Sequence, residues 1–285
     1  MEGYEKAEKV LETLQRLPAM SAPVLKVIQL AGDPDASAEE LADSIRSEPT
    51  LTADVLRVAN SAYYGVPGQV TTVRTGVILL GMATIRSLAM MAAAHTWLDQ
   101  PELHGRRGRE LWDHLLTTAL YASELARRYA PAFQEEAFCC GLLHDLGKIA
   151  LLTALGKQYD NTLAAAAQRR MPDVAAERMA FGFDHEAIGL ALARKWKLPE
   201  MLCDVIGFHH DPRHAEHKRD FVEFVHAADH LYWKQALGEN FAPERWPVEE
   251  EVAFKFELND PTWLQYLGEA VEKTKKEFLS ALMAA

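Results

Sequence analysis

Histidine and aspartate residues occur in a fixed order along this chain, each in an otherwise apolar stretch. The segment GLLHDLGKIALL (141–152) places His144, Asp145 and Lys148 within an apolar run. On a helix over 138–152, His144 and Lys148 would share one face, and Asp145 is three residues from Lys148. Charged groups are rarely buried without partners, because their desolvation is costly. These three groups must therefore be compensated by one another or by something that the protein binds.

Five further residues of metal-binding type lie on other predicted helices: His114, His185, His209, His210 and Asp229. Taken alone, a histidine on an apolar face is more often a hydrogen-bonded core residue than a ligand. The ordered set favours a ligand role, because imidazole and carboxylate together suit borderline divalent ions such as Fe, Mn, Co, Ni or Zn. Seven ligands exceed what one tetrahedral zinc ion needs, so the set predicts a metal site that could hold two bridged ions.

The elements that must position these residues are predicted to be helices, and the fold class is all-α. Apolar residues recur at helical spacing over 1–17, 36–49, 49–65, 71–98, 109–130, 135–155, 157–170, 173–181, 184–197, 199–210, 219–237 and 261–283. Ser37 and Glu40 form a predicted capping box, Asp184 a predicted N-cap, and Gly81 a predicted helix break. VAFKFEL (252–258) alternates like a strand, but a single short strand has no visible partner.

Two packed helical lobes are expected, without a long flexible linker. PELHGRRGRE (101–110) is polar, contains glycine and lacks apolar periodicity, so it is the best candidate for the link. The predicted domains are an N-terminal lobe over 1–98 and a second lobe over 99–285. The second lobe carries the candidate metal site and a C-terminal helical extension.

Composition limits the possible function classes. The net charge of −11 and the pI near 5.5 argue against nonspecific binding to nucleic acid or to an anionic membrane. The N-terminus lacks the basic-then-apolar pattern of a signal peptide, so a cytoplasmic location is expected. Cys139, Cys140 and Cys203 show no C-x-x-C spacing and are expected to be buried free thiols.

A histidine, an adjacent His-Asp pair and a later aspartate follow the order of the HD superfamily of metal-dependent phosphohydrolases, which this sequence resembles. The further histidine and the histidine pair make it similar to the dinuclear branch that includes the HD-GYP cyclic-di-GMP phosphodiesterases. The resemblance implies that these residues are metal ligands: His114, His144, Asp145, His185, His209, His210 and Asp229. It also implies that Lys148 contacts the scissile phosphate and that Glu110 is an extra ligand, as in some three-metal members.

A second resemblance covers more of the chain. The segments over 17–65, 79–90, 111–126, 138–152 and 183–210 are similar to the HDOD domain, the HD-related output domain of bacterial signal transduction. The likeness spans about residues 17–215. In this family the domain often serves as a regulatory or interaction module.

One departure bears on activity. HD-GYP enzymes follow the paired histidines with a motif containing glycine and tyrosine, whereas this chain continues HHDPRHAEHKRD (209–220). Two interpretations follow: a signalling module that binds a protein partner and holds a metal, nucleotide or other phosphate-containing ligand, or a metal-dependent phosphohydrolase that acts on a nucleotide or cyclic dinucleotide. The overall resemblance favours the first interpretation, and the complete ligand set favours the second. His226 and His230, four residues apart, are predicted to lie on a solvated helix face.

Overall fold

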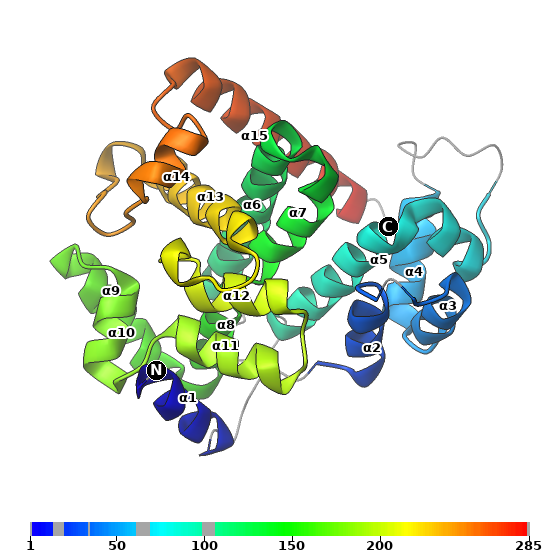
Figure 1. The fold of residues 1–285 in the computed structure, drawn as a ribbon, viewed down its shortest axis with the longest axis horizontal. Helices are drawn as coiled ribbons and strands as arrows, with labels where there is room; N and C mark the ends of the chain where they lie inside the picture. Colours follow the sequence, from blue (N-terminus) through cyan, green and yellow to red (C-terminus); the bar gives the residue numbers. More distant parts are fainter. Residues whose placement is uncertain (1, 14–19, 34, 61–68, 99–105, 284–285) are drawn as a thin grey trace. The chain divides into compact units, whose positions relative to one another are not determined.

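The computed structural model describes residues 2–13, 20–33, 35–60, 69–98 and 106–283 (Figure 1). Helices account for nearly all of the regular structure in these ranges, and no strand occurs within them. The all-α prediction is therefore confirmed. VAFKFEL, which alternates like a strand, instead contributes to a short helix, α14 (Glu250–Lys255), followed by α15 (Pro261–Met283).

The chain forms two compact units. One comprises Ala19–Trp97, and the other joins Met1–Pro18 to Leu98–Ala285. The first helix, α1 (Glu2–Thr13), packs against α11 (His185–Lys195), so residues 1–18 group with the second unit and not with the lobe to which the sequence assigned them. The first half of the predicted link over 101–110 lies outside the described residues, and α6 (Arg106–Tyr129) begins in its second half.

The unit over Ala19–Trp97 consists of α2 (Ala22–Leu30), α3 (Ala38–Arg46), α4 (Pro49–Ala59) and α5 (Val73–Leu98). The predicted capping box is present: Ser37 Oγ accepts from Glu40 N at 3.2 Å, and Glu40 Oε2 accepts from Ser37 N at 2.9 Å. The predicted break is also present, because Gly81 interrupts α5 with φ 79° and ψ 164°. Positive φ suits glycine, which has no Cβ to clash.

The other unit is built around α6, which packs against α7 (Gln134–Leu143), α13 (Arg219–Leu237) and α15. A second group of helices centres on α11, which packs against α8 (Leu146–Leu155) and α12 (Glu200–Phe208) (Figure 1). Two further helices, α9 (Lys157–Arg169) and α10 (Asp173–Phe181), pack on each other, and α12 joins the two groups by packing against α7 and α13. Within the described ranges, short 3₁₀ segments connect some of these helices: η2 (Pro131–Phe133), η3 (Pro212–His214) and η4 (Gly238–Asn240).

The His-Asp segment departs from the expected continuous helix. α7 ends at Leu143 and α8 begins at Leu146, so His144 and Asp145 occupy the turn between two helices. Helical residues can only point outward from one axis, whereas a turn lets two neighbouring side chains enter the same site. The prediction of one helix across 138–152 is therefore wrong, and the break is what brings both side chains to the centre of the unit.

A close backbone approach fixes α8 against α11. A Cβ atom added to Gly147 would lie 1.8 Å from the carbonyl oxygen of His185 and 3.0 Å from the amide nitrogen of Gly189. Only glycine permits this approach. It places the turn that carries Asp145 directly beside the start of α11.

Two described segments, Val73–Ala94 and Pro131–Leu155, are long and apolar enough to cross a membrane by length and composition alone. The most apolar window of the second is 89% buried inside the protein, as expected of core helices, and that of the first is 56% buried. The three cysteines are free and buried, as predicted: Cys139, Cys140 and Cys203.

Candidate metal centre

The structure brings all seven predicted ligand residues to one buried place. They come from α6, the α7–α8 turn, the first residue of α11, the end of α12 and the middle of α13: His114, His144, Asp145, His185, His209, His210 and Asp229. All except His210 are almost fully buried. Three groups within this set have ligand atoms that all lie within 4.8 Å of one another: His185 with His209 and His210, His114 with His144 and Asp229, and His144 with Asp145 and His209.

Asp145 lies between the two halves of the set. Its Oδ2 is 3.0 Å from His114 Nε2 and 3.4 Å from His144 Nε2. Its Oδ1 is 3.4 Å from His185 Nε2 and 3.5 Å from His209 Nε2. One carboxylate therefore presents a different oxygen to each histidine pair, which is the arrangement of a ligand that bridges two ions.

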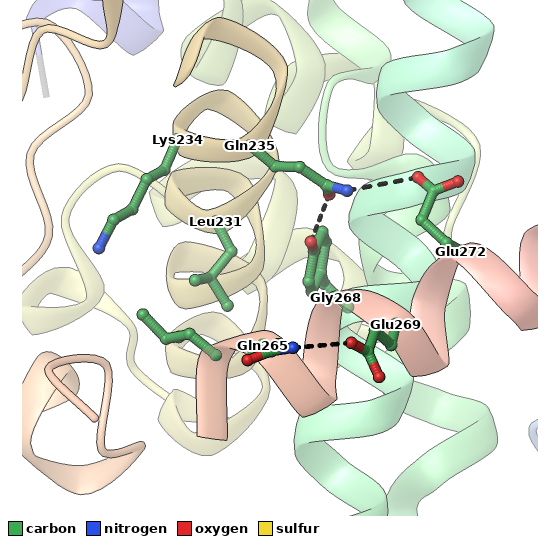
Figure 2. Close-up of a pocket in the computed structure, with 9 residues that line it drawn as sticks. Leu231, Lys234, Gln235, Gln265, Gly268, Glu269 and Glu272 are labelled. Atoms are coloured by element: carbon green, nitrogen blue, oxygen red, sulfur yellow. Dashed lines mark hydrogen bonds between the residues drawn. The ribbon is translucent and has the colours of Figure 1, made fainter. Parts of the chain in front are cut away.

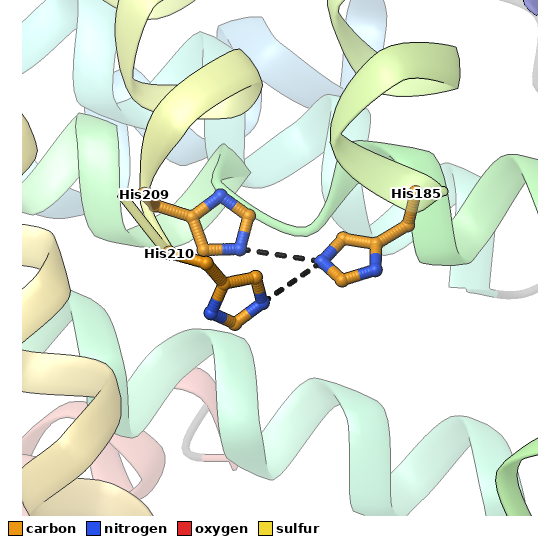
Figure 3. Close-up of side chains that lie close together, drawn as sticks. All are labelled: His185, His209 and His210. Atoms are coloured by element: carbon orange, nitrogen blue, oxygen red, sulfur yellow. Dashed lines mark hydrogen bonds between the residues drawn. The ribbon is translucent and has the colours of Figure 1, made fainter. Parts of the chain in front are cut away.

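The second half of the set is a triangle of histidines (Figure 3). His185 Nε2 lies 3.4 Å from His209 Nε2 and 3.1 Å from His210 Nε2. In the first half, the Nε2 atoms of His114 and His144 are also only 3.1 Å apart. The imidazole nitrogens therefore face one another at hydrogen-bond distance or slightly more.

The opposite nitrogens of three rings are already used. His144 Nδ1 donates to Gly141 O at 2.7 Å, and His209 Nδ1 donates to Val205 O at 3.2 Å. Because a carbonyl oxygen can only accept, each of these rings in its neutral form carries its lone pair on Nε2, toward the centre. His185 Nδ1 likewise donates to the Glu177 carboxylate at 2.7 Å.

Facing lone pairs in a buried site call for a cation. A proton on His185 Nε2 can lie between only one such pair, whereas a divalent ion accepts several lone pairs at once. Two buried carboxylate oxygens, Asp145 Oδ1 and Asp229 Oδ1, accept no hydrogen bond from the described residues. Imidazole nitrogens and carboxylate oxygens are suitable ligands for borderline transition metals. The residues present therefore fit one or two such ions.

Electrostatics keep most of the site ready for a cation. Burial lowers the pKa of His144 to about 3 and holds that of His210 well below its usual range, so both rings are neutral at pH 7. Burial opposes the charge of Asp145, but Lys148 and the histidines outweigh it and keep the pKa of that carboxyl well below its usual range. Burial would also lower the pKa of His185, but Glu177 raises it to about 9. A metal ion would take the place of the extra His185 proton.

Lys148 lies at the edge of this centre and is almost fully buried. Its Nζ is 2.8 Å from Asp145 Oδ2 and its side chain is 8% exposed. Burial disfavours its charge, but Asp145 and Asp173 outweigh that effect and raise the pKa of the ammonium. Lys148 is therefore a permanent cation beside the Asp145 carboxylate.

Two supporting carboxylates were not predicted from the sequence. Glu177 accepts from the backbone nitrogen of His185 at 2.8 Å as well as from its ring, and from the Tyr159 hydroxyl at 2.5 Å. Glu186 accepts from the backbone nitrogen of His210 at 2.9 Å. A carboxylate on the distal nitrogen of a ligating histidine fixes its ring and raises its basicity. The signal in the sequence is slight: Gly182 marks a turn after Glu177 but does not reveal what Glu177 faces.

Three other predicted candidates lie elsewhere. The Glu110 side chain is 47% exposed, with Arg107 at 3.7 Å, and is not part of the buried set. The prediction that His226 and His230 lie on a solvated face is wrong, because both are buried. His226 Nδ1 donates to His209 O at 2.7 Å and its Nε2 accepts from Glu249 N at 3.0 Å, so this ring is a structural link. His230 Nδ1 donates to Trp246 O at 2.9 Å.

A separate surface pocket lies between α13, α15 and Tyr121 of α6 (Figure 2). It shares no residue with the metal centre. Five of its polar side chains bind one another: Gln235 accepts from the Tyr121 hydroxyl and donates to Glu272 at 3.3 Å, and Gln265 donates to Glu269 at 3.0 Å. No histidine lines the pocket, and each of its two carboxylates already accepts a hydrogen bond from an amide side chain. The buried centre is therefore the stronger candidate for function.

Known proteins share this fold. An HDOD domain protein of unknown function from Geobacter sulfurreducens superposes with a TM-score of 0.69 and 25% identity, covering 99% of this chain and 96% of that one. A Shewanella amazonensis protein, whose name proposes a phosphohydrolase, superposes with a TM-score of 0.67 and 24% identity. The match covers 95% of this chain and 93% of that one. An uncharacterized protein of Treponema pallidum is 25% identical over 210 residues, which are 73% of this chain. The chain spans only 40% of that relative's length.

A family model also matches most of the chain. Residues 17–212 match the model of the HDOD domain, and this range includes six of the seven converging side chains. Asp229 follows the matched region and completes the site from α13. The helical fold, the buried histidine–aspartate centre and this match agree with one another, and the chain belongs to the HDOD domain family.

Proposed function

We propose that this chain is a cytoplasmic signal-transduction module whose metal centre binds one or two divalent ions, of Fe, Mn, Co, Ni or Zn, together with a phosphate-containing ligand. A protein partner in the same pathway receives the signal. The bound ions would act as Lewis acids toward the oxygens of the ligand's phosphate. Lys148 would contribute a fixed positive charge beside them.

The position of Asp145 carries this proposal. Its two oxygens face separate histidine pairs at 3.0–3.5 Å, and the histidine nitrogens on each side turn lone pairs toward the same space. A buried carboxylate and five imidazoles are costly to desolvate unless an ion compensates them. Hydrogen bonding within the set leaves Asp145 Oδ1 without a donor.

The segment after His210 supports binding without efficient turnover. It folds back on α12, because Asp204 of that helix accepts from His217 N at 2.8 Å and from Lys218 N at 3.0 Å. Asp211 is occupied by Arg213 at 2.8 Å, and the segment has no glycine to let its backbone approach a substrate closely. Productive attack on phosphorus needs alignment to within about 1 Å, beyond which rates fall on the order of a hundredfold.

Metal analysis of the purified protein tests the proposal. We expect one or two transition-metal ions per chain, and loss of metal from a His144→Ala, Asp145→Ala double variant. The matched control is His214→Ala, which removes a histidine whose side chain is 68% exposed. A folded wild-type protein that takes up no divalent ion from a metal-supplemented buffer would contradict the proposal.

A metal-dependent phosphohydrolase is the second candidate. The buried contact between Lys148 and Asp145 favours it, because a cation at this position can stabilise charge that develops on phosphoryl oxygens. Turnover of cyclic-di-GMP and of a generic phosphodiester, measured on the metal-loaded sample, separates the two functions. We expect weak or absent turnover. Robust turnover that the double variant loses would make the chain an enzyme.

A further inference from the structure

Four charged side chains of alternating sign lead outward from the metal centre. Lys148 Nζ contacts Asp145 at 2.8 Å and lies 3.9 Å from Asp173 Oδ2. The other oxygen of Asp173 accepts from Arg245 Nη2 at 2.9 Å. Asp173 is the first residue of α10, whereas Arg245 belongs to the segment between η4 and α14. One carboxylate therefore occupies the space between two cations that come from distant parts of the sequence.

The Arg245 guanidinium has an unused donor. Its Nε is buried and has no hydrogen-bond partner among the described residues. Nε–H and one Nη2–H of an arginine lie side by side and can bind two oxygens of a carboxylate or phosphate. Asp173 uses only the Nη2 half of this edge. An oxyanion with a third oxygen could take both donors and still reach Lys148.

Arg245 is held in position by its neighbours. Its guanidinium carbon lies 4.4 Å from the Trp246 ring centroid, and Trp246 stacks on Trp233 at 4.7 Å. His230 fixes the backbone of Trp246 by donating to its carbonyl oxygen. The side chain is only 14% exposed. A cation that is already ordered loses little conformational entropy when it binds a ligand.

We propose that Arg245 and Lys148 form a two-cation clamp for one phosphate group, and that Asp173 is the carboxylate which this phosphate displaces. The clamp deepens the proposed function and rests on it, because the phosphate belongs to the ligand of the metal centre. Arg245 is the specificity-determining residue: its two parallel donors select a phosphate or similar oxyanion over a ligand with one acceptor.

The charge balance adds a condition. The carboxylates of Asp145, Asp173, Glu177 and Asp229 outnumber the cations Lys148, Arg245 and protonated His185, so the metal-free centre repels an anion. Divalent ions reverse this balance. Phosphate binding is therefore expected to be stronger in the metal-loaded protein than in the metal-free protein.

Calorimetric titration with inorganic phosphate tests the clamp, using metal-loaded and metal-free samples of the full chain. We expect Arg245→Gln to weaken phosphate binding about tenfold, since charge-assisted bonds are lost. Arg245→Lys keeps the charge but not the paired donors, and should also weaken it. Asp173→Asn removes the competing charge and should tighten it. Arg219→Gln, an arginine whose side chain is 47% exposed, is the control and should bind like wild type.

The opposite signs of the Asp173 and Arg245 effects distinguish a clamp from a structural ion pair, since breaking a structural pair from either side would act in one direction. The metal content and melting temperature of each variant are measured on the same samples. Wild-type protein that binds no phosphate, or variants that all bind like wild type in both samples, would overturn the clamp. Wild-type protein that holds no metal would contradict the proposed function separately, through the metal count.

Discussion

Gly147 offers a test of how the fold positions the metal centre. In Gly147→Ala, the added Cβ would lie 1.8 Å from the His185 carbonyl oxygen and 2.7 Å from its carbonyl carbon. Both are backbone atoms, which cannot rotate away as a flexible side chain could. The two helices α8 and α11 must therefore separate by roughly 1 Å before the methyl group fits.

The cost has two opposing parts. Overpacking of this kind costs typically about 1–3 kcal/mol, and contact with backbone on two sides puts this position at the upper end. The helix propensity of alanine is about 1 kcal/mol more favourable than that of glycine, and this difference offsets part of that cost. We expect a net loss of about 2 kcal/mol of unfolding free energy, equivalent to a melting temperature about 4–8 °C lower.

The effect on the metal should exceed the effect on stability. Separation of the helices moves His185 away from Asp145, whose Oδ1 is 3.4 Å from its Nε2. Metal–ligand distances tolerate only about 0.2 Å, so we expect metal affinity to fall at least roughly tenfold.

Urea unfolding and metal titration of the same samples measure both effects. Gly268→Ala is the matched control, because its Cβ would meet only the Tyr121 hydroxyl at 3.8 Å, an ordinary contact. This variant should be as stable as wild type or slightly more stable, with unchanged metal binding. A Gly147→Ala protein with wild-type stability and wild-type metal affinity would refute the close packing described for α8 and α11.

Three further predictions concern the support of the centre. Glu177→Gln should lower metal affinity about 10–100-fold by releasing the His185 ring, whereas unchanged affinity in a metal titration would show that this carboxylate does not orient it. Tyr159→Phe removes one hydrogen bond to Glu177 and should lower the free energy of unfolding in urea by about 1 kcal/mol, with a smaller loss of metal affinity than Glu177→Gln. A loss of metal affinity as large as that of Glu177→Gln would contradict this prediction. Removing metal with a chelator should lower the melting temperature. Adding metal back to a concentration of about 1,000 Kd should restore about 4 kcal/mol of unfolding free energy. A melting temperature that does not change with metal would argue against a site that binds ions only in the folded protein.

The order of the helices could be predicted from the sequence because their signals are local. Capping at Ser37, the break at Gly81 and the N-cap at Asp184 depend on residues within one or two turns, and each occurs where it was expected. The break between α7 and α8 could not be predicted in the same way. The run from Cys139 to Leu152 is apolar almost throughout, so its periodicity does not register a turn, and tertiary packing decides where the helix ends.

The candidate ligands could be predicted from the sequence for a different reason. Their order along the chain, together with the family likeness, identifies the set without knowledge of its geometry. The supporting residues carry no such pattern. Glu177 acts on His185 only because α10 turns back beside α11, and Asp173 meets Arg245 only because residues 72 apart in sequence come together. Contacts of this kind depend on the whole fold and leave no spacing to recognise.

The part of the chain beyond the family match completes the site and joins it to the C-terminal segment. Asp229 lies on α13, and the same helix holds the segment between η4 and α14 through His226 and His230. His226 bonds the His209 backbone on one side and Glu249 on the other. A ligand that displaces Asp173 from Arg245 therefore binds a segment already fixed to the metal centre. The same segment leads into α14, where Phe254 is 86% exposed.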